Sequence, residues 1–196
     1  MLDAHLRRDP PGAGALRNRL ALHSAAASAK ILRVNADEPA LRDLRFALGD
    51  DPGPPARLLR LWRDLAGRPP RLDRDWIVDA AARLDLAVDP NDLVASLKAC
   101  AGEGDPVSAA SKSAALLASA FPDAPAAEAE ILALWLFDLV LALRLRWPRP
   151  LPLVATKVLD PSLRSDGGGR ARPGEPAWEK HAAGAIARAA ASALDL

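Results

Sequence analysis

The feature that most constrains this chain is residues 131–143, ILALWLFDLVLAL, which are apolar at every position except Asp138. A helix that is apolar on all faces has to be covered by neighbouring elements on all sides. The stretch therefore predicts a central core helix at about residues 125–146, surrounded by other helices. It is followed by WPRPLP at residues 147–152, where the prolines cannot continue a helix.

The same stretch is too short to cross a membrane. It runs for 13 residues before Arg144, whereas a membrane span needs about 20. Asp138 at its middle would also cost about 2.5–3.5 kcal/mol on insertion into a bilayer. Residues 1–9 lack the apolar region of a secretory signal. We therefore expect no membrane partner and a cytoplasmic location.

The composition favours a helical protein. Half of the 196 residues are hydrophobic but only 4% are aromatic, and the abundant Ala and Leu favour helices, whereas β-branched and aromatic residues suit strands. The net charge of +1 argues against a nucleic-acid surface covering the whole protein. The single cysteine excludes an internal disulfide and a cysteine-based zinc site.

The hydrophobic periodicity, together with the glycines and prolines that interrupt it, predicts an all-α, single-domain, irregular bundle of about eight helices over residues 1–196. Amphipathic patterns place the longer outer helices at residues 16–34, 56–66, 73–84, 89–101, 107–121 and 177–194. Asp73 is the expected N-cap of its helix, and Asp79 is spaced to pair with Arg83 four residues later. Residues 49–55 are expected to be non-helical because they contain three prolines and two glycines, and residues 160–176 to form a flexible Gly/Pro-rich loop. Both chain ends are abrupt, as in a fragment of a longer protein.

Two sequence strings are distinctive, DDPGP at residues 50–54 and WPRPLPL at residues 147–153. With these strings as its most specific parts, the chain from about Leu20 to the C-terminus resembles a bacterial protein family of unknown function, DUF1403. This resemblance implies one helical domain. It implies no catalytic or binding residues, because the family has no established activity.

Asp138 is the sharpest candidate for a functional residue. A carboxylate among leucines has a raised pKa unless it is paired, and such groups occur at catalytic sites. The structural alternative, which we favour, is a buried ion pair or a hydrogen bond to the terminus of an adjacent helix. If the partner is a charge, Asp138→Ala should cost about 3–5 kcal/mol. In the enzymatic or small-molecule-binding alternative, Asp138 acts together with His23 or His181.

The sequence predicts no metal or cofactor site. Histidines lack the paired spacing of a zinc site, and no P-loop or dinucleotide-binding fingerprint is present. No nucleophile and base can be assigned as a catalytic pair. His23 and His181 are more simply read as histidines at the edge of the core.

A basic segment at residues 57–74 raises the possibility of nucleic-acid binding. Its arginines outnumber its aspartates by six to two, and the first three of them, Arg57, Arg60 and Arg63, lie on one face of the helix expected there. This basic patch could meet phosphates. A solvated helix face explains it equally well, and no aromatic interleaving marks a nucleic-acid module.

The leading functional prediction is a non-enzymatic helical binding or scaffolding protein with a protein partner. The first alternative is an enzyme or small-molecule binder that uses a buried Asp138 site. The second alternative is a nucleic-acid-associated protein that uses the 57–74 segment.

Overall fold

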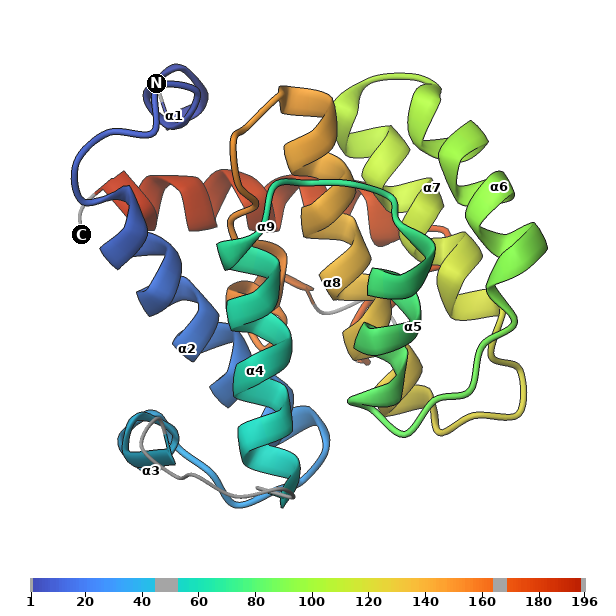
Figure 1. The fold of residues 1–196 in the computed structure, drawn as a ribbon, viewed down its shortest axis with the longest axis horizontal. Coiled ribbons are helices and arrows are strands. Elements are labelled where there is room, and N and C mark those ends of the chain that lie inside the picture. The colour runs from blue at the N-terminus through green and yellow to red at the C-terminus, as the bar shows by residue number, and fades with distance from the viewer. Residues whose placement is uncertain (1, 45–52, 164–168, 195–196) are drawn as a thin grey trace.

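The chain folds as an all-α protein, as the sequence predicts (Figure 1). The structure is a computed structural model that describes residues 2–44, 53–163 and 169–194. Its elements in chain order are α1 (Leu2–Leu6), α2 (Ala13–Ile31), α3 (Glu38–Asp43), α4 (Gly53–Gly67), α5 (Arg74–Ala82), α6 (Pro90–Gly102), α7 (Pro106–Ser119), α8 (Ala126–Leu145), the 3-10 turns η2 (Val154–Lys157) and η3 (Pro161–Leu163), and α9 (Trp178–Leu194).

Helix α8 carries the apolar stretch, and residues 129–142 within it are all buried. Figure 1 shows α8 between α4 on one side and α7 on the other. Its most extensive partner is α7, whose buried residues apart from Leu117 have small side chains, which let the two backbones approach closely. These small residues are Ala109, Ala110, Ser111, Ser113 and Ala114.

Helix α2 packs along α4, and a chain of hydrogen bonds joins them in the interior. The indole N–H of Trp62 donates to the Ser28 hydroxyl at 3.0 Å, and that hydroxyl donates to the Ser24 carbonyl at 2.8 Å. Because all three residues are buried, these bonds replace the hydrogen bonds that water would otherwise provide.

Helix α8 ends through a left-handed residue before the prolines are reached. Arg146 has φ 56°, and the N–H of Trp147 then donates to the carbonyl of Ala142 at 3.0 Å. This is the hydrogen bond of a Schellman motif, which satisfies a carbonyl at the helix end. The Trp147 indole in turn donates to Asp3 of α1 at 2.9 Å, so the end of α8 also holds the N-terminal helix.

The start of α4 corrects one prediction. The prolines at positions 54 and 55 were expected to be non-helical, but they lie in the first turn of α4, which begins at Gly53. The first turn tolerates proline because its N–H groups have no partner within the helix, and the fixed φ of proline suits it. The rest of that expected loop, residues 49–52, lies outside the described residues.

Helix α5 confirms one local prediction and contradicts another. Asp73 is its N-cap and accepts hydrogen bonds from the N–H groups of Asp75 and Trp76. Arg83, however, bonds to Asp64 of α4 rather than to Asp79. A tertiary neighbour thus replaces the expected partner one turn away.

In the part of the chain that the structure describes, no helix has both the length and the hydrophobicity that crossing a membrane would require.

Candidate functional site

Asp138 is completely buried, and its carboxylate is bonded to backbone groups. Its two oxygens accept hydrogen bonds from the N–H groups of Leu153, at 3.0 Å, and Val154, at 3.2 Å. These N–H groups open the 3-10 turn η2, where donors have no partner within the turn. Burial raises the pKa of Asp138 well above its ordinary value, and the two backbone hydrogen bonds oppose that shift.

One of the two histidines considered with Asp138 pairs with another carboxylate. The Nδ1 of His23 is 3.3 Å from a carboxylate oxygen of Glu38, and both side chains are more than a third exposed. His181 lies half-buried on α9, one turn after Trp178. Asp138 and His23 therefore have different partners, and the carboxylate occupies the place of an internal helix cap.

The basic patch expected at residues 57–74 is partly neutralised. Arg57 lies 2.7 Å from a carboxylate oxygen of Asp85. Arg68 lies 3.7 Å from Asp64 and also over the ring of Trp76, at 5.7 Å from its centre. Arg60 is exposed, and Arg63 is half-buried. These arginines do not form one continuous row of unpaired cations.

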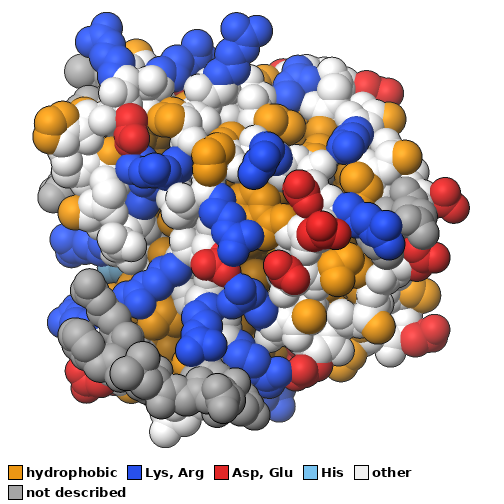
Figure 2. Space-filling view, viewed as in Figure 1, with side chains coloured by type: hydrophobic (Ala, Val, Ile, Leu, Met, Phe, Trp, Pro, Cys, Tyr) orange, Lys and Arg blue, Asp and Glu red, His pale blue; other side chains and the backbone are white. Residues whose placement is uncertain are grey.

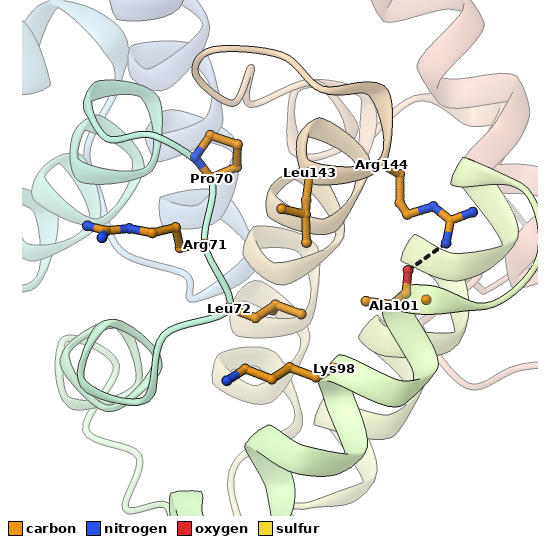
Figure 3. Close-up of a pocket in the computed structure, with 8 residues that line it drawn as sticks. Pro70, Arg71, Leu72, Lys98, Ala101, Leu143 and Arg144 are labelled. Carbon is orange, nitrogen blue, oxygen red and sulfur yellow. Dashed lines mark hydrogen bonds between the residues drawn. The ribbon is translucent and has the colours of Figure 1, made fainter.

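An open groove on the protein surface is lined by both apolar and cationic side chains. It has a volume of about 480 Å³ and lies where the α4–α5 connection faces α6 and the end of α8 (Figure 3). We call it the cationic groove and define it by its lining residues, Pro70, Arg71, Leu72, Lys98, Ala101, Gly102, Leu143 and Arg144.

Side chains from three separate elements form the apolar floor of this groove. Figure 3 shows Pro70 and Leu72 of the connection on one side and Leu143 of α8 opposite them, with Ala101 of α6 to the side. Figure 2 shows apolar surface in the middle of this face of the molecule, bordered by both basic and acidic side chains.

The lining includes three cations, which differ in the hydrogen bonds that they already form. The guanidinium of Arg144 donates to the carbonyls of Ala101, at 2.9 Å, and Gly104, so it binds the carboxyl end of α6, where a positive charge is favourable. Lys98 and Arg71 are exposed and form no ion pair within the described ranges. Figure 3 shows the Lys98 side chain beneath Leu72 and the Arg71 side chain extending outward from the connection.

The sequence does not predict this groove. Its apolar residues come from the connection, α6 and α8, which are separated by long stretches of chain, and each of them fits the ordinary pattern of its own element. The one sequence feature that points to the groove is Arg144, which interrupts the apolar run of α8 where that helix reaches the surface. Knowledge of which helices are neighbours was needed to assemble the site.

A second charged cluster also escaped prediction. Glu130 of α8 is almost fully buried, and Arg170 binds both of its carboxylate oxygens, at 2.8 and 2.6 Å. Arg172 approaches the same carboxylate at 3.5 Å. Both arginines belong to the Gly/Pro-rich segment expected at residues 160–176, of which residues 164–168 lie outside the described part. The cluster joins that segment to α8.

Among residues 2–44, 53–163 and 169–194, the acidic, histidine and cysteine side chains do not gather in groups of three or more that could hold a metal ion.

The fold and the groove together define an all-helical protein with an apolar, cation-bordered recess on its surface. Comparison with known protein families assigns the chain to one of them. It belongs to DUF1403, a family described as proteins of unknown function, whose model matches residues 1–195. No curated protein and no solved structure matches the chain.

Proposed function

We propose that this protein is a non-enzymatic binding protein and that the cationic groove is its contact surface for a protein partner. The observation that carries the proposal is the make-up of the groove. The lining combines an apolar floor with three cations, and none of its eight residues is acidic. Such a surface buries apolar side chains and attracts negative charge at the same time.

The shape of the groove favours a protein partner over a small molecule. Sites for small molecules usually enclose most of the ligand surface. The cationic groove is open to solvent on the protein surface, which suits side chains that project from a larger partner. In protein interfaces, a few anchor side chains in such recesses provide most of the binding free energy.

The environment of Asp138 supports a structural role for this residue and so favours the non-enzymatic proposal. A general acid or base has to come within hydrogen-bond reach of its substrate. Both oxygens of Asp138 already accept backbone hydrogen bonds, and the side chain is buried. A catalytic use would require η2 to move away.

Photo-crosslinking in the native cells tests the proposal. A photoreactive amino acid is placed at Lys98 in the groove or, as the control, at Lys180, an exposed lysine of α9. We expect a defined protein adduct from position 98 that is missing from position 180. Identical adducts from both positions, or none from position 98, would contradict the proposal.

A further inference from the structure

We infer that the occupant of the cationic groove is an acidic protein segment carrying an apolar anchor side chain between carboxylates. The inference rests on the proposed function and adds to it the chemistry of the partner. It is drawn from the charges, the floor and the arrangement of the three elements around the groove.

Charge complementarity favours an acidic partner. The lining contributes three positive charges and no negative one. Arg144 already binds the carbonyls at the end of α6, and it is close enough to Asp105 to add to the lowering of that carboxyl's pKa by the N–H of Ser108, so its charge is partly compensated. Lys98 and Arg71 have no ion-pair partner in the described part of the protein. A partner with carboxylates would neutralise these cations.

The apolar floor gives a further argument. Leu72 and Leu143 face the same space from opposite elements, and Ala101 and Pro70 extend the apolar surface around them (Figure 3). Filling this space with a Leu, Ile or Phe side chain removes apolar surface of both partners from water. A purely acidic segment would leave the floor exposed to water.

The cations lie on two sides of the floor. Figure 3 shows Arg144 beside Leu143 at one border and Lys98 beneath Leu72 at another, whereas the Arg71 side chain extends away on the far side of the connection. Arg144 and Lys98 therefore lie on different sides of the apolar contact. A segment with carboxylates on both sides of an apolar residue matches this arrangement.

The same observations disfavour a nucleic acid in this groove. Proteins that bind single strands combine a charged track with aromatic rings on which bases stack. The eight lining residues include no aromatic side chain, and their centre is aliphatic. A nucleic acid is therefore treated as an outcome that the test has to exclude.

The test is a selection from a random dodecapeptide library on the purified chain, followed by binding measurements with the enriched peptides. We expect peptides that combine Asp or Glu with Leu, Ile or Phe. Their binding should weaken when the salt concentration rises from about 0.05 M to about 0.5 M, because salt screens exposed charges. A single-stranded oligonucleotide of random sequence serves as the competitor.

Two variants locate the binding. Lys98→Glu reverses an exposed charge in the groove, and Gly102→Leu fills the groove from the end of α6, where an added Cβ would meet no atom within 4 Å. Each should weaken binding by about tenfold or more. The matched controls are Lys180→Glu on α9 and Gly14→Leu on α2, whose Cβ position is likewise free. They should change binding by less than about twofold.

The outcomes separate the two proposals. The inference of an acidic segment would be overturned if the enriched peptides were basic or uncharged, or if they bound both groove variants as tightly as the wild type. The proposed binding function would still stand in that case, provided that the adduct at position 98 forms. If the oligonucleotide displaces the peptides and its own binding is weakened by Lys98→Glu, the occupant of the groove is a nucleic acid and not a protein segment. No enrichment of any peptide would overturn this inference, and a missing adduct at position 98 would then overturn the proposed function as well.

Discussion

The carboxylate of Asp138 accepts a 3.0 Å hydrogen bond from the backbone N–H of Leu153, a residue 15 positions later in the chain. Val154 donates the second bond to the same carboxylate. The first N–H groups of a helical turn have no partner within the turn, and at complete burial water cannot reach them. Asp138 therefore connects the core helix α8 to η2, which also contacts α2 and α9.

Removing this carboxylate should destabilise the protein. Asp138→Ala leaves two buried N–H groups without an acceptor, at about 1–3 kcal/mol each, and we expect the free energy of unfolding to fall by about 2–6 kcal/mol. The structure thus changes the reason for the loss expected from the sequence, because backbone dipoles and not a buried cation are left unpaired. Urea denaturation measures the effect. The exposed Asp123→Ala is the control, and an equal midpoint for both variants would contradict the prediction.

The stability contributed by Asp138 should decrease as pH rises. Because burial raises its pKa in the folded state, the folded protein holds this proton more tightly than the unfolded chain does. The contribution is complete below the unfolded pKa of about 3.9 and is lost as pH rises through the raised folded pKa, by at most about 1.4 kcal/mol per pH unit.

Asp138→Asn, which does not titrate at this position, is the reference for that measurement. It retains one acceptor oxygen and should fold. We expect the free energy of unfolding of the wild type, relative to the Asn variant, to fall as the pH rises above the unfolded pKa of about 3.9. A difference that stays constant, or one that grows with pH, would show that the pKa of Asp138 is not raised.

In the Glu130 cluster, removing Arg170 should destabilise the protein more than removing Arg172. Arg170→Ala takes away both hydrogen bonds to a buried carboxylate, and we expect a loss of about 2–3 kcal/mol. The loss stays below that of a fully isolated charge because Arg172 remains 3.5 Å away. Arg172→Ala removes a half-exposed partner and should cost less than about 1 kcal/mol. Thermal unfolding of the two variants compares these effects, and equal losses would contradict the assignment.

Two buried serines should respond in opposite ways to the same substitution. Ser28→Ala leaves the buried indole N–H of Trp62 without an acceptor, and we expect a loss of about 1–3 kcal/mol. The hydroxyl of Ser113 has no hydrogen-bond partner within the described structure, so Ser113→Ala should be neutral or stabilising. Chemical denaturation of both variants side by side tests this. A larger loss for Ser113→Ala would contradict the hydrogen-bond assignment.

The sequence predicted the helices well where the signal lies within a few residues. Asp73 was identified as an N-cap because its carboxylate reaches N–H groups two and three residues later. The start of α4 was misplaced because prolines that break a helix interior are accepted in its first turn. Arg83 was assigned to the wrong partner because Asp64, on another helix, is invisible to a pattern of four-residue spacing.

For the candidate sites too, the sequence predicts the local features and not the contacts between distant segments. Asp138 was singled out correctly as a buried carboxylate that needs a partner, and a helix terminus was one of the partners considered. Which terminus could not be predicted, because the path of residues 146–153 brings η2 back onto α8. The groove was not anticipated at all, since Lys98, Leu143 and Leu72 become neighbours only when α6, α8 and the α4–α5 connection pack together.

The sequence by itself determined that this chain is all-helical, that residues 131–143 lie in the core and that Asp138 has to be satisfied there. These properties follow from local periodicity and from the cost of burying polar groups, which act on each segment separately. The tertiary structure decided that Asp138 binds the start of η2, that Glu130 binds Arg170, and that a cation-bordered groove opens beside Leu143. Those pairings depend on the packing of distant segments, and their choice is a property of the whole fold.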